Sequence, residues 1–247
     1  MSNAADLEIY VGSVDYFWEG EWRPTDPEPP LPEGLTITRF RIIGVDDRQT
    51  NQKKIRSWRD RMTTELDGWL SAPLDWDETD PRHAVATPGS KCWMALMYWA
   101  AYAEFSEEPP AAVGDVDLAQ QDPIFCRLQQ LPASPRFVQI LQSIDYWLPA
   151  SFDTVLDSTG PGGDIACIGS SPVLLEQLKA LNDETWKADR ATIQAWSDAG
   201  RPADEKLESQ ARYAFAEFLS AAQFSCDHRL PMIYYLDKSA LWPKSGA

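Results

Sequence analysis

The stretch IACIGSSPVLLEQLKALN, residues 165–182, joins a short apolar run to a leucine-rich segment through the turn Gly-Ser-Ser-Pro. Residues 165–170 have the length and apolar character of a buried strand, and leucines recur at helical spacing within 174–181. Ser171 is a suitable N-cap residue, and Pro172 suits the first helical turn. The stretch therefore predicts a strand that leads directly into a helix.

The same turn has the outline of a phosphate-binding loop. A P-loop needs a lysine beside its serine or threonine, whereas the first lysine after this turn is Lys179. Pro172 also lacks the backbone N–H that would contact a phosphate. We conclude that the turn at 169–172 is not a P-loop, although a weak anion site at the start of the helix stays open.

A second functional interpretation of the turn is a nucleophile elbow. That motif needs a small residue after the serine as well as before it, and the turn supplies only Gly169 and a serine. Asp227 and His228 would complete the order Ser…Asp…His, but adjacent residues rarely serve as the orienting acid and the base of one triad. We predict that the turn is architectural, and a hydrolase that uses Ser170 or Ser171 with His228 is the alternative.

Around this stretch the chain alternates between short strands and longer helices. Apolar alternation predicts strands at 7–14, 35–45 and 231–237, and the first two could form a hairpin across the proline-rich segment between them. Apolar residues at helical spacing predict seven helices, at 50–72, 87–105, 122–131, 134–149, 172–186, 188–199 and 203–227.

These elements predict a helix-dominated α+β fold with a small β-sheet, made of an N-terminal hairpin and short later strands. We expect residues 1–247 to form a single domain, and a subdomain boundary near 150–160 is the alternative. The tryptophans at helical spacing, such as Trp58, Trp69 and Trp93, are expected to lie in the core.

Negative charge is the strongest feature of the composition. The 247 residues include 38 Asp and Glu against 22 Lys and Arg, which gives a net charge of -16. Such a field repels nucleic acid, and it attracts a basic protein and accelerates their association. No apolar run has the length of a membrane span, and the N-terminus lacks the features of a signal peptide, so we expect a cytoplasmic protein without a membrane partner.

Cysteine and histidine patterns do not suggest a metal or a cofactor. The four cysteines are too far apart for a Cys-x-x-Cys motif, and we expect reduced, mostly buried thiols. These residues are Cys92, Cys126, Cys167 and Cys226, and the only histidines are His83 and His228.

One segment opposes the overall charge. RQTNQKKIRSWRDR, residues 48–61, has six basic residues and one acid, Asp60. The simplest interpretation is a solvated helix face that neutralises nearby acids, and the alternative is a contact with an anion or RNA.

Two acidic stretches are interleaved with aromatic residues: DYFWEGEW, residues 15–22, and LDWDETD, residues 74–80. The second has the acid spacing of a calcium loop, but it lacks the central glycine and distal glutamate of an EF-hand. Carboxylates can pair with Arg or Lys of a basic protein while aromatic rings anchor the contact, although the rings could instead pin a proline-rich loop. The predicted partner-binding residues are Asp75, Asp77, Glu78, Asp80, Trp76, Glu19, Glu21, Trp18 and Trp22.

With these acidic stretches, its charge and the lack of a complete catalytic set, the chain resembles bacterial immunity proteins, which are cytosolic antidotes to interbacterial toxins. The resemblance implies a non-enzymatic protein that covers the active site of a basic toxin, for example a nuclease. It does not identify binding residues, because immunity proteins differ in fold. A structural or adaptor protein is a further alternative.

Overall fold

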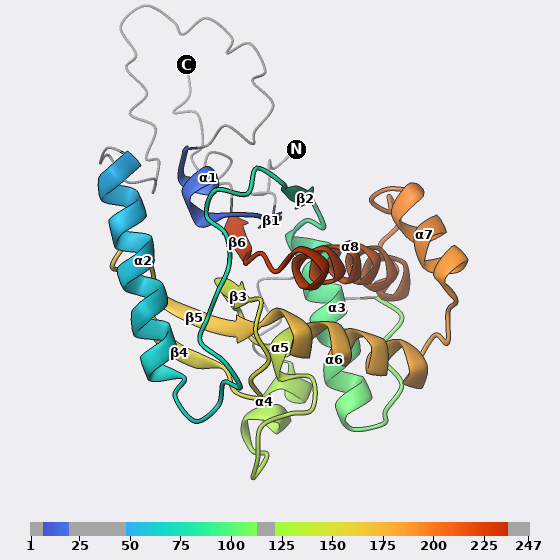
Figure 1. Cartoon of the computed structure of the whole chain (residues 1–247). Helices are drawn as coiled ribbons and strands as arrows, with labels where there is room; N and C mark the ends of the chain where they lie inside the picture. The colour runs from blue at the N-terminus through green and yellow to red at the C-terminus, as the bar shows by residue number, and fades with distance from the viewer. Residues whose placement is uncertain (1–6, 20–47, 113–121, 237–247) are drawn as a thin grey trace, which may run out of the picture.

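The structure is a computed structural model that describes residues 7–19, 48–112 and 122–236 (Figure 1). These residues form a mixed six-stranded sheet with helices on both faces, which confirms the predicted helix-dominated α+β fold. The strands are β1 (Leu7–Val11), β2 (Ala84–Ala86), β3 (Tyr146–Leu148), β4 (Leu156–Thr159), β5 (Ile165–Ser170) and β6 (Met232–Leu236). The helices are α1 (Val14–Glu19), α2 (Arg48–Glu65), α3 (Ser90–Glu104), α4 (Pro123–Gln129), α5 (Val138–Leu141), α6 (Ser171–Glu184), α7 (Arg190–Asp198) and α8 (Leu207–His228).

The strand order is β2-β1-β6-β3-β5-β4, and only β3 and β5 run parallel to each other. Strand β1 pairs with β2 and with β6, so both of its edges are occupied between Ile9 and Val11. The strand predicted to form a hairpin with β1, 35–45, lies outside the described residues. The predicted pairing is corrected, because β2 and β6 are the observed neighbours of β1. The chain after β1 turns into α1, where the sequence predicts no helix.

The predicted helix at 134–149 is wrong. Only Val138–Leu141 is helical, and Tyr146–Leu148 form β3 between β5 and β6. The backbone of Asp145 extends this pairing, because its N–H donates to Cys167 O at 2.9 Å and its carbonyl accepts from Tyr234 N at 2.9 Å. Pairing with two neighbouring strands outweighs the helical spacing of a short apolar segment.

Side chains alternate between two cores along the strands. Ile9 and Trp147 face the core under α3, α6 and α8, whereas Tyr10 and Leu148 face the core under α1 and α2. Figure 1 shows α2 on one side of the sheet and α3, α6 and α8 on the other. Strands from both sides of the interval 150–160 belong to this one sheet.

The end of α2 explains why one tryptophan is exposed. The helix ends at Glu65, earlier than predicted, and Gly68 in the following turn has a φ of 84°. Trp69 follows this turn and is 56% exposed, whereas Trp58 and Trp93 lie in the core as expected.

The strand leads directly into the helix, as predicted. The N-cap residue is Ser170 rather than Ser171, and its Oγ accepts from Val173 N at 3.2 Å and donates to Ala150 O at 2.8 Å. Ser171 begins the helix and donates to Trp147 O at 3.3 Å. None of the helices in the described ranges combines the length and apolarity that crossing a membrane requires.

Candidate partner-binding surface

The loop between α2 and β2 carries four of the predicted partner-binding acids. Asp75 and Asp77 are exposed. The carboxylate of Asp77 accepts from Thr79 N at 2.8 Å and from Thr79 Oγ1 at 2.7 Å, and these bonds hold its pKa below the ordinary value. Both residues therefore present carboxylates to solvent, and that of Asp77 has a fixed orientation.

The other two acids of the loop are held by the protein. Glu78 turns inward, where one oxygen accepts from Asp15 N at 3.0 Å and the other accepts from Trp76 Nε1. Burial raises the pKa of Glu78. Asp80 accepts from Arg82 Nε at 2.9 Å, and this hydrogen bond lowers the pKa of Asp80. Glu78 thus ties the loop to α1, and Asp80 is neutralised by its neighbour.

The aromatic anchors are not exposed where the structure describes them. Trp18 and Trp76 are each 4% exposed and pack into the core under α2, where the Trp76 ring lies 5.9 Å from that of Trp58. This corrects the expectation that they form an accessible surface. Glu21, Trp22 and the side chain of Glu19 lie outside the described residues.

A second acidic group lies at the β4–β5 edge of the sheet, and its members stand too far apart in the sequence to be predicted as a group. Asp157 lies opposite Cys167 in the strand register, and Asp145 accepts from Cys167 N at 2.8 Å. Burial raises the pKa of Asp145, and the charges of Asp164 and Asp157 raise it further. Burial raises the pKa of the Cys167 thiol to about 11, and the negative charges of Asp157 and Asp145 contribute to this shift. The three carboxylates therefore make a locally negative edge, which we call the sheet-edge acids.

The burial of the Asp145 carboxylate, together with the repulsion from Asp164 and Asp157, gives a prediction for Asp145→Asn. The amide oxygen can still accept from Cys167 N–H, so at pH 7 the variant should be more stable than wild type by less than about 1 kcal/mol. Because the folded pKa of Asp145 lies above its ordinary value of 3.8, wild type regains stability as pH falls from above the folded pKa to below 3.8. The difference should therefore close on acidification.

Thermal unfolding of both proteins as a function of pH measures this difference. Asp153→Asn, at an exposed carboxylate, is the control and should behave like wild type. A variant that is less stable than wild type at pH 7 would show that the Cys167 hydrogen bond outweighs the cost of burial and repulsion.

The residues of the hydrolase alternative are not assembled for catalysis. Ser170 and Ser171 are fully buried, and Ser171 accepts from Ser225 Oγ at 2.8 Å. His228 ends α8, and its Nδ1 lies 2.9 Å from Arg82 Nη1. Among the hydrogen bonds of the described residues, none joins either serine to the imidazole, which is the contact that a serine–histidine mechanism requires.

Potential metal ligands are dispersed in the part of the chain that the structure describes. There, no group of three or more His, Cys, Asp or Glu residues is placed to hold a metal ion. All four cysteines are free, and Cys126 is exposed rather than buried.

The basic segment 48–61 lies on α2, and several of its cations bind the protein itself. Arg48 pairs with the buried Asp15 at 3.4 Å. Arg59 donates to Trp76 O at 2.8 Å and lies 5.4 Å from the centre of the Trp76 ring. Arg61 donates to a backbone carbonyl of β4 at 2.5 Å. The contact of Arg48 neutralises an acid, as the simplest interpretation expects, whereas Arg59 and Arg61 contact backbone carbonyl groups and a ring.

Comparison with known proteins gives one match. A profile of the family described as "Putative DNA-mimic protein" matches residues 40–234, which is most of the chain. No curated protein and no solved structure matches. The matched region begins before α2 and ends within β6, so it includes both acidic surfaces described above.

Proposed function

Because the chain belongs to this DNA-mimic family, we propose that it is a non-enzymatic protein that binds a basic, DNA-binding protein in place of DNA. The observation that carries the proposal, beside the family, is the excess of 38 acids over 22 bases. DNA attracts its partners through closely spaced phosphate charges, which Lys and Arg neutralise. Carboxylates that form no internal ion pair can take the place of those phosphates.

Four exposed carboxylates in two groups meet this requirement. Asp75 and Asp77 lie on the loop before β2, and Asp157 and Asp164 belong to the sheet-edge acids. None of the four forms an ion pair with a cation of the described residues. They are therefore available for charge-assisted hydrogen bonds with arginines and lysines of a partner.

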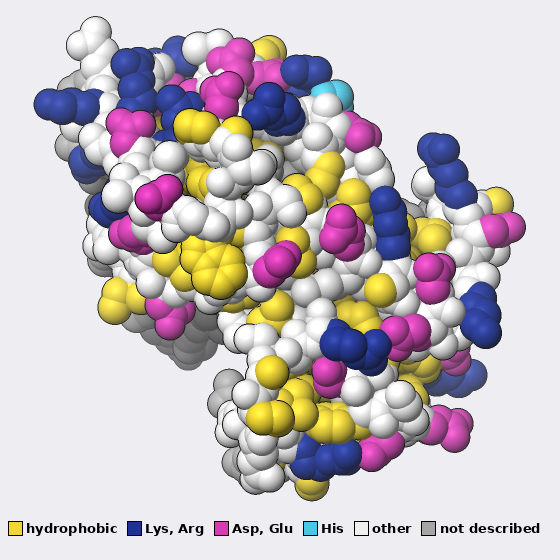
Figure 2. Space-filling model, turned by 60° about the horizontal axis from the view of Figure 1, so that its bottom comes forward, with side chains coloured by type: hydrophobic (Ala, Val, Ile, Leu, Met, Phe, Trp, Pro, Cys, Tyr) yellow, Lys and Arg dark blue, Asp and Glu magenta, His cyan; other side chains and the backbone are white. Residues whose placement is uncertain are grey.

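Other parts of the surface are electrostatically mixed. On the face in Figure 2, blue Lys and Arg side chains alternate with magenta Asp and Glu side chains. A partner that is recognised by charge must therefore contact particular groups of carboxylates, because it would meet both signs elsewhere.

The narrower hypothesis is that the partner is a basic toxin, as the resemblance to immunity proteins implies. A toxin that cleaves DNA must bind DNA at a basic surface, and a DNA mimic that occupies this surface would block cleavage. The hypothesis predicts that this protein inhibits DNA cleavage by its partner in proportion to the amount bound.

Elution from immobilised DNA tests the proposal. Proteins of the native host are loaded on DNA-cellulose, and the purified acidic protein is added. We expect it to release a specific basic protein at low salt, beyond what salt alone elutes, and this added release should fall as salt screens the charges. Replacement of Asp75, Asp77, Asp157 and Asp164 with asparagine should raise the concentration needed by about tenfold or more, since a tenfold change needs only about 1.4 kcal/mol, which is about the value of one hydrogen bond to a charged group.

A control variant with the same net charge distinguishes the effect of these four positions from the effect of the overall charge. Its four amide substitutions are at exposed acids elsewhere, namely Asp67, Asp153, Glu176 and Asp183. If both variants lose activity equally, the site assignment fails. If wild type releases no protein at any salt concentration, the DNA-mimic proposal fails.

A further inference from the structure

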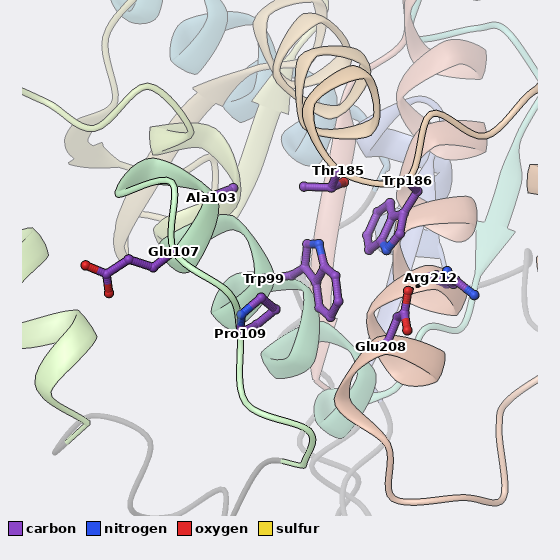
Figure 3. A pocket seen from close by; sticks show the side chains of 8 residues that line it. All are labelled: Trp99, Ala103, Glu107, Pro109, Thr185, Trp186, Glu208 and Arg212. Carbon is purple, nitrogen blue, oxygen red and sulfur yellow. Dashed lines mark hydrogen bonds and ion pairs between the residues drawn. The ribbon is translucent and has the colours of Figure 1, made fainter.

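A pocket of about 330 Å³ lies where the C-terminal ends of α3 and α6 meet the first turns of α8 (Figure 3). Its walls include Trp99 and Ala103 of α3, Thr185 and Trp186 just after α6, and Glu208 of α8. The volume is at the lower end of the range for ligand sites. The pocket belongs to neither of the two acidic groups described above.

The aromatic wall of the pocket is fixed in place. The rings of Trp99 and Trp186 stack with their centres 5.2 Å apart and their planes at 27°. Trp186 is also held edge-on by Phe215 at 5.2 Å and by Trp196 at 5.6 Å. Figure 3 shows Trp99 in the middle of the pocket, between Pro109 and Trp186. A ligand that stacks on Trp99 would meet an ordered surface, which reduces the entropy cost of binding.

The electrostatics of the pocket favour a cation. Helix α3 ends at Glu104 and α6 ends at Glu184, and neither has a basic residue in its last turn. The two helix ends carry partial negative charge, and the protein places a guanidinium there itself, since Arg136 donates to Ala103 O at 3.0 Å and pairs with Glu184 at 2.7 Å. The positive group in the lining, Arg212, is bound by Glu208.

The protein's own arginines show which cation suits this region. Each of three arginines around the pocket forms an ion pair with a glutamate and also lies over an aromatic ring. The distances from the guanidinium carbon to the ring centre are 4.1, 4.9 and 5.1 Å. These are Arg127 with Glu107 and Phe105, Arg136 with Glu184 and Phe137, and Arg212 with Glu208 and Trp196. Trp99 lies among these sites, and no cation of the described residues covers its ring.

We propose that this pocket takes an arginine side chain of the basic partner, with the guanidinium stacked on Trp99 and donating to Glu208. The side chain of Glu208 is 46% exposed and uses one oxygen for Arg212, so the other oxygen can accept from the partner. Arginine fits better than lysine because a planar guanidinium stacks on a ring and donates to a carboxylate at the same time. The inference rests on the proposed function, since DNA-binding surfaces are rich in arginine.

Titration with a defined peptide tests the pocket. The full chain, with ¹⁵N in its tryptophan indoles, is titrated with acetyl-Arg-Arg-Arg-amide at about 0.15 M salt to screen weak surface contacts. We expect saturable shifts of the Trp99 and Trp186 indole N–H signals. Trp99→Leu removes the aromatic face and should weaken binding about threefold to tenfold, whereas Trp99→Phe should retain most of it. Glu208→Gln, at a partly exposed position that should not affect folding, should weaken binding to a similar extent.

Matched peptides and the elution assay separate the possible failures. The tri-lysine peptide should bind more weakly, and the tri-glutamate peptide should shift neither indole. The pocket proposal is overturned if tri-glutamate binds there, if tri-arginine leaves both indoles unshifted, or if Trp99→Leu and Glu208→Gln bind like wild type. In each of these cases the proposed function still stands if wild type releases a basic protein from DNA-cellulose and the asparagine variant at Asp75, Asp77, Asp157 and Asp164 does not.

Discussion

Replacing Phe218 with alanine is expected to lower the free energy of unfolding by about 3–5 kcal/mol, because it removes a large side chain from the centre of the core. Phe218 is fully buried on α8. Its ring stacks on Trp93 of α3 at 4.2 Å and meets Trp147 of β3 edge-on at 6.0 Å. The substitution therefore leaves a cavity where two helices contact the sheet. Urea denaturation followed by circular dichroism measures the loss.

Two further variants separate the cavity from other effects. Phe218→Leu keeps much of the volume and should cost only about 1–2 kcal/mol. Trp69→Ala removes a larger ring, but one that is 56% exposed, and should change stability by no more than about 0.5 kcal/mol. If Phe218→Ala costs no more than Trp69→Ala, the packing of α8 on the sheet is not as described.

Gly169→Ala should cost about 2–4 kcal/mol although it adds a single methyl group. A Cβ at this position would lie 2.3 Å from Gln139 Oε1 and 2.8 Å from Ile144 Cδ1. Gln139 is fully buried, and the same oxygen accepts from Ser170 N at 3.0 Å. The added methyl group must therefore displace Gln139 and leave a buried N–H without its acceptor at the start of α6.

The effect should depend on this crowding rather than on glycine itself. Gly162→Ala is the matched control, since its Cβ would meet only the side-chain oxygen of Asp164, at 3.0 Å in an exposed turn. We expect Gly162→Ala to change the free energy of unfolding by less than about 0.5 kcal/mol. Equal effects of the two substitutions in thermal unfolding would contradict the role assigned to Gln139.

The sequence by itself determined the elements that carry a long or unambiguous local pattern. The strand at 165–170 and the helix after it were predicted from an apolar run, a serine–proline start and a leucine stripe, and both were found. The long helices α2, α3 and α8 were predicted for the same reason, because apolar residues at a period of 3.6 give each helix one buried face. Net charge also follows from the sequence directly, and with it the expectation of a basic partner.

Short strands were decided by the tertiary structure. β2 and β4 have three and four residues, which are too few to show an alternating apolar pattern in the sequence. They are strands because they form backbone hydrogen bonds with β1 and β5, respectively. β3 has a helical pattern in the sequence and becomes a strand between β5 and β6.

The tertiary structure also decided which acids and rings are available to a partner. Trp76 and Glu78 stand in an acidic stretch, but the ring lies in the core and the carboxylate turns toward α1, because burial depends on what packs against the loop. In the sequence, β3 and the loop that follows it separate Asp145 from Asp157. The two become neighbours because each borders Cys167 in the sheet. Trp99 and Trp186 meet in the same way at the ends of two helices. A local pattern fixes the period of an element, whereas the proximity of distant residues depends on how the elements pack.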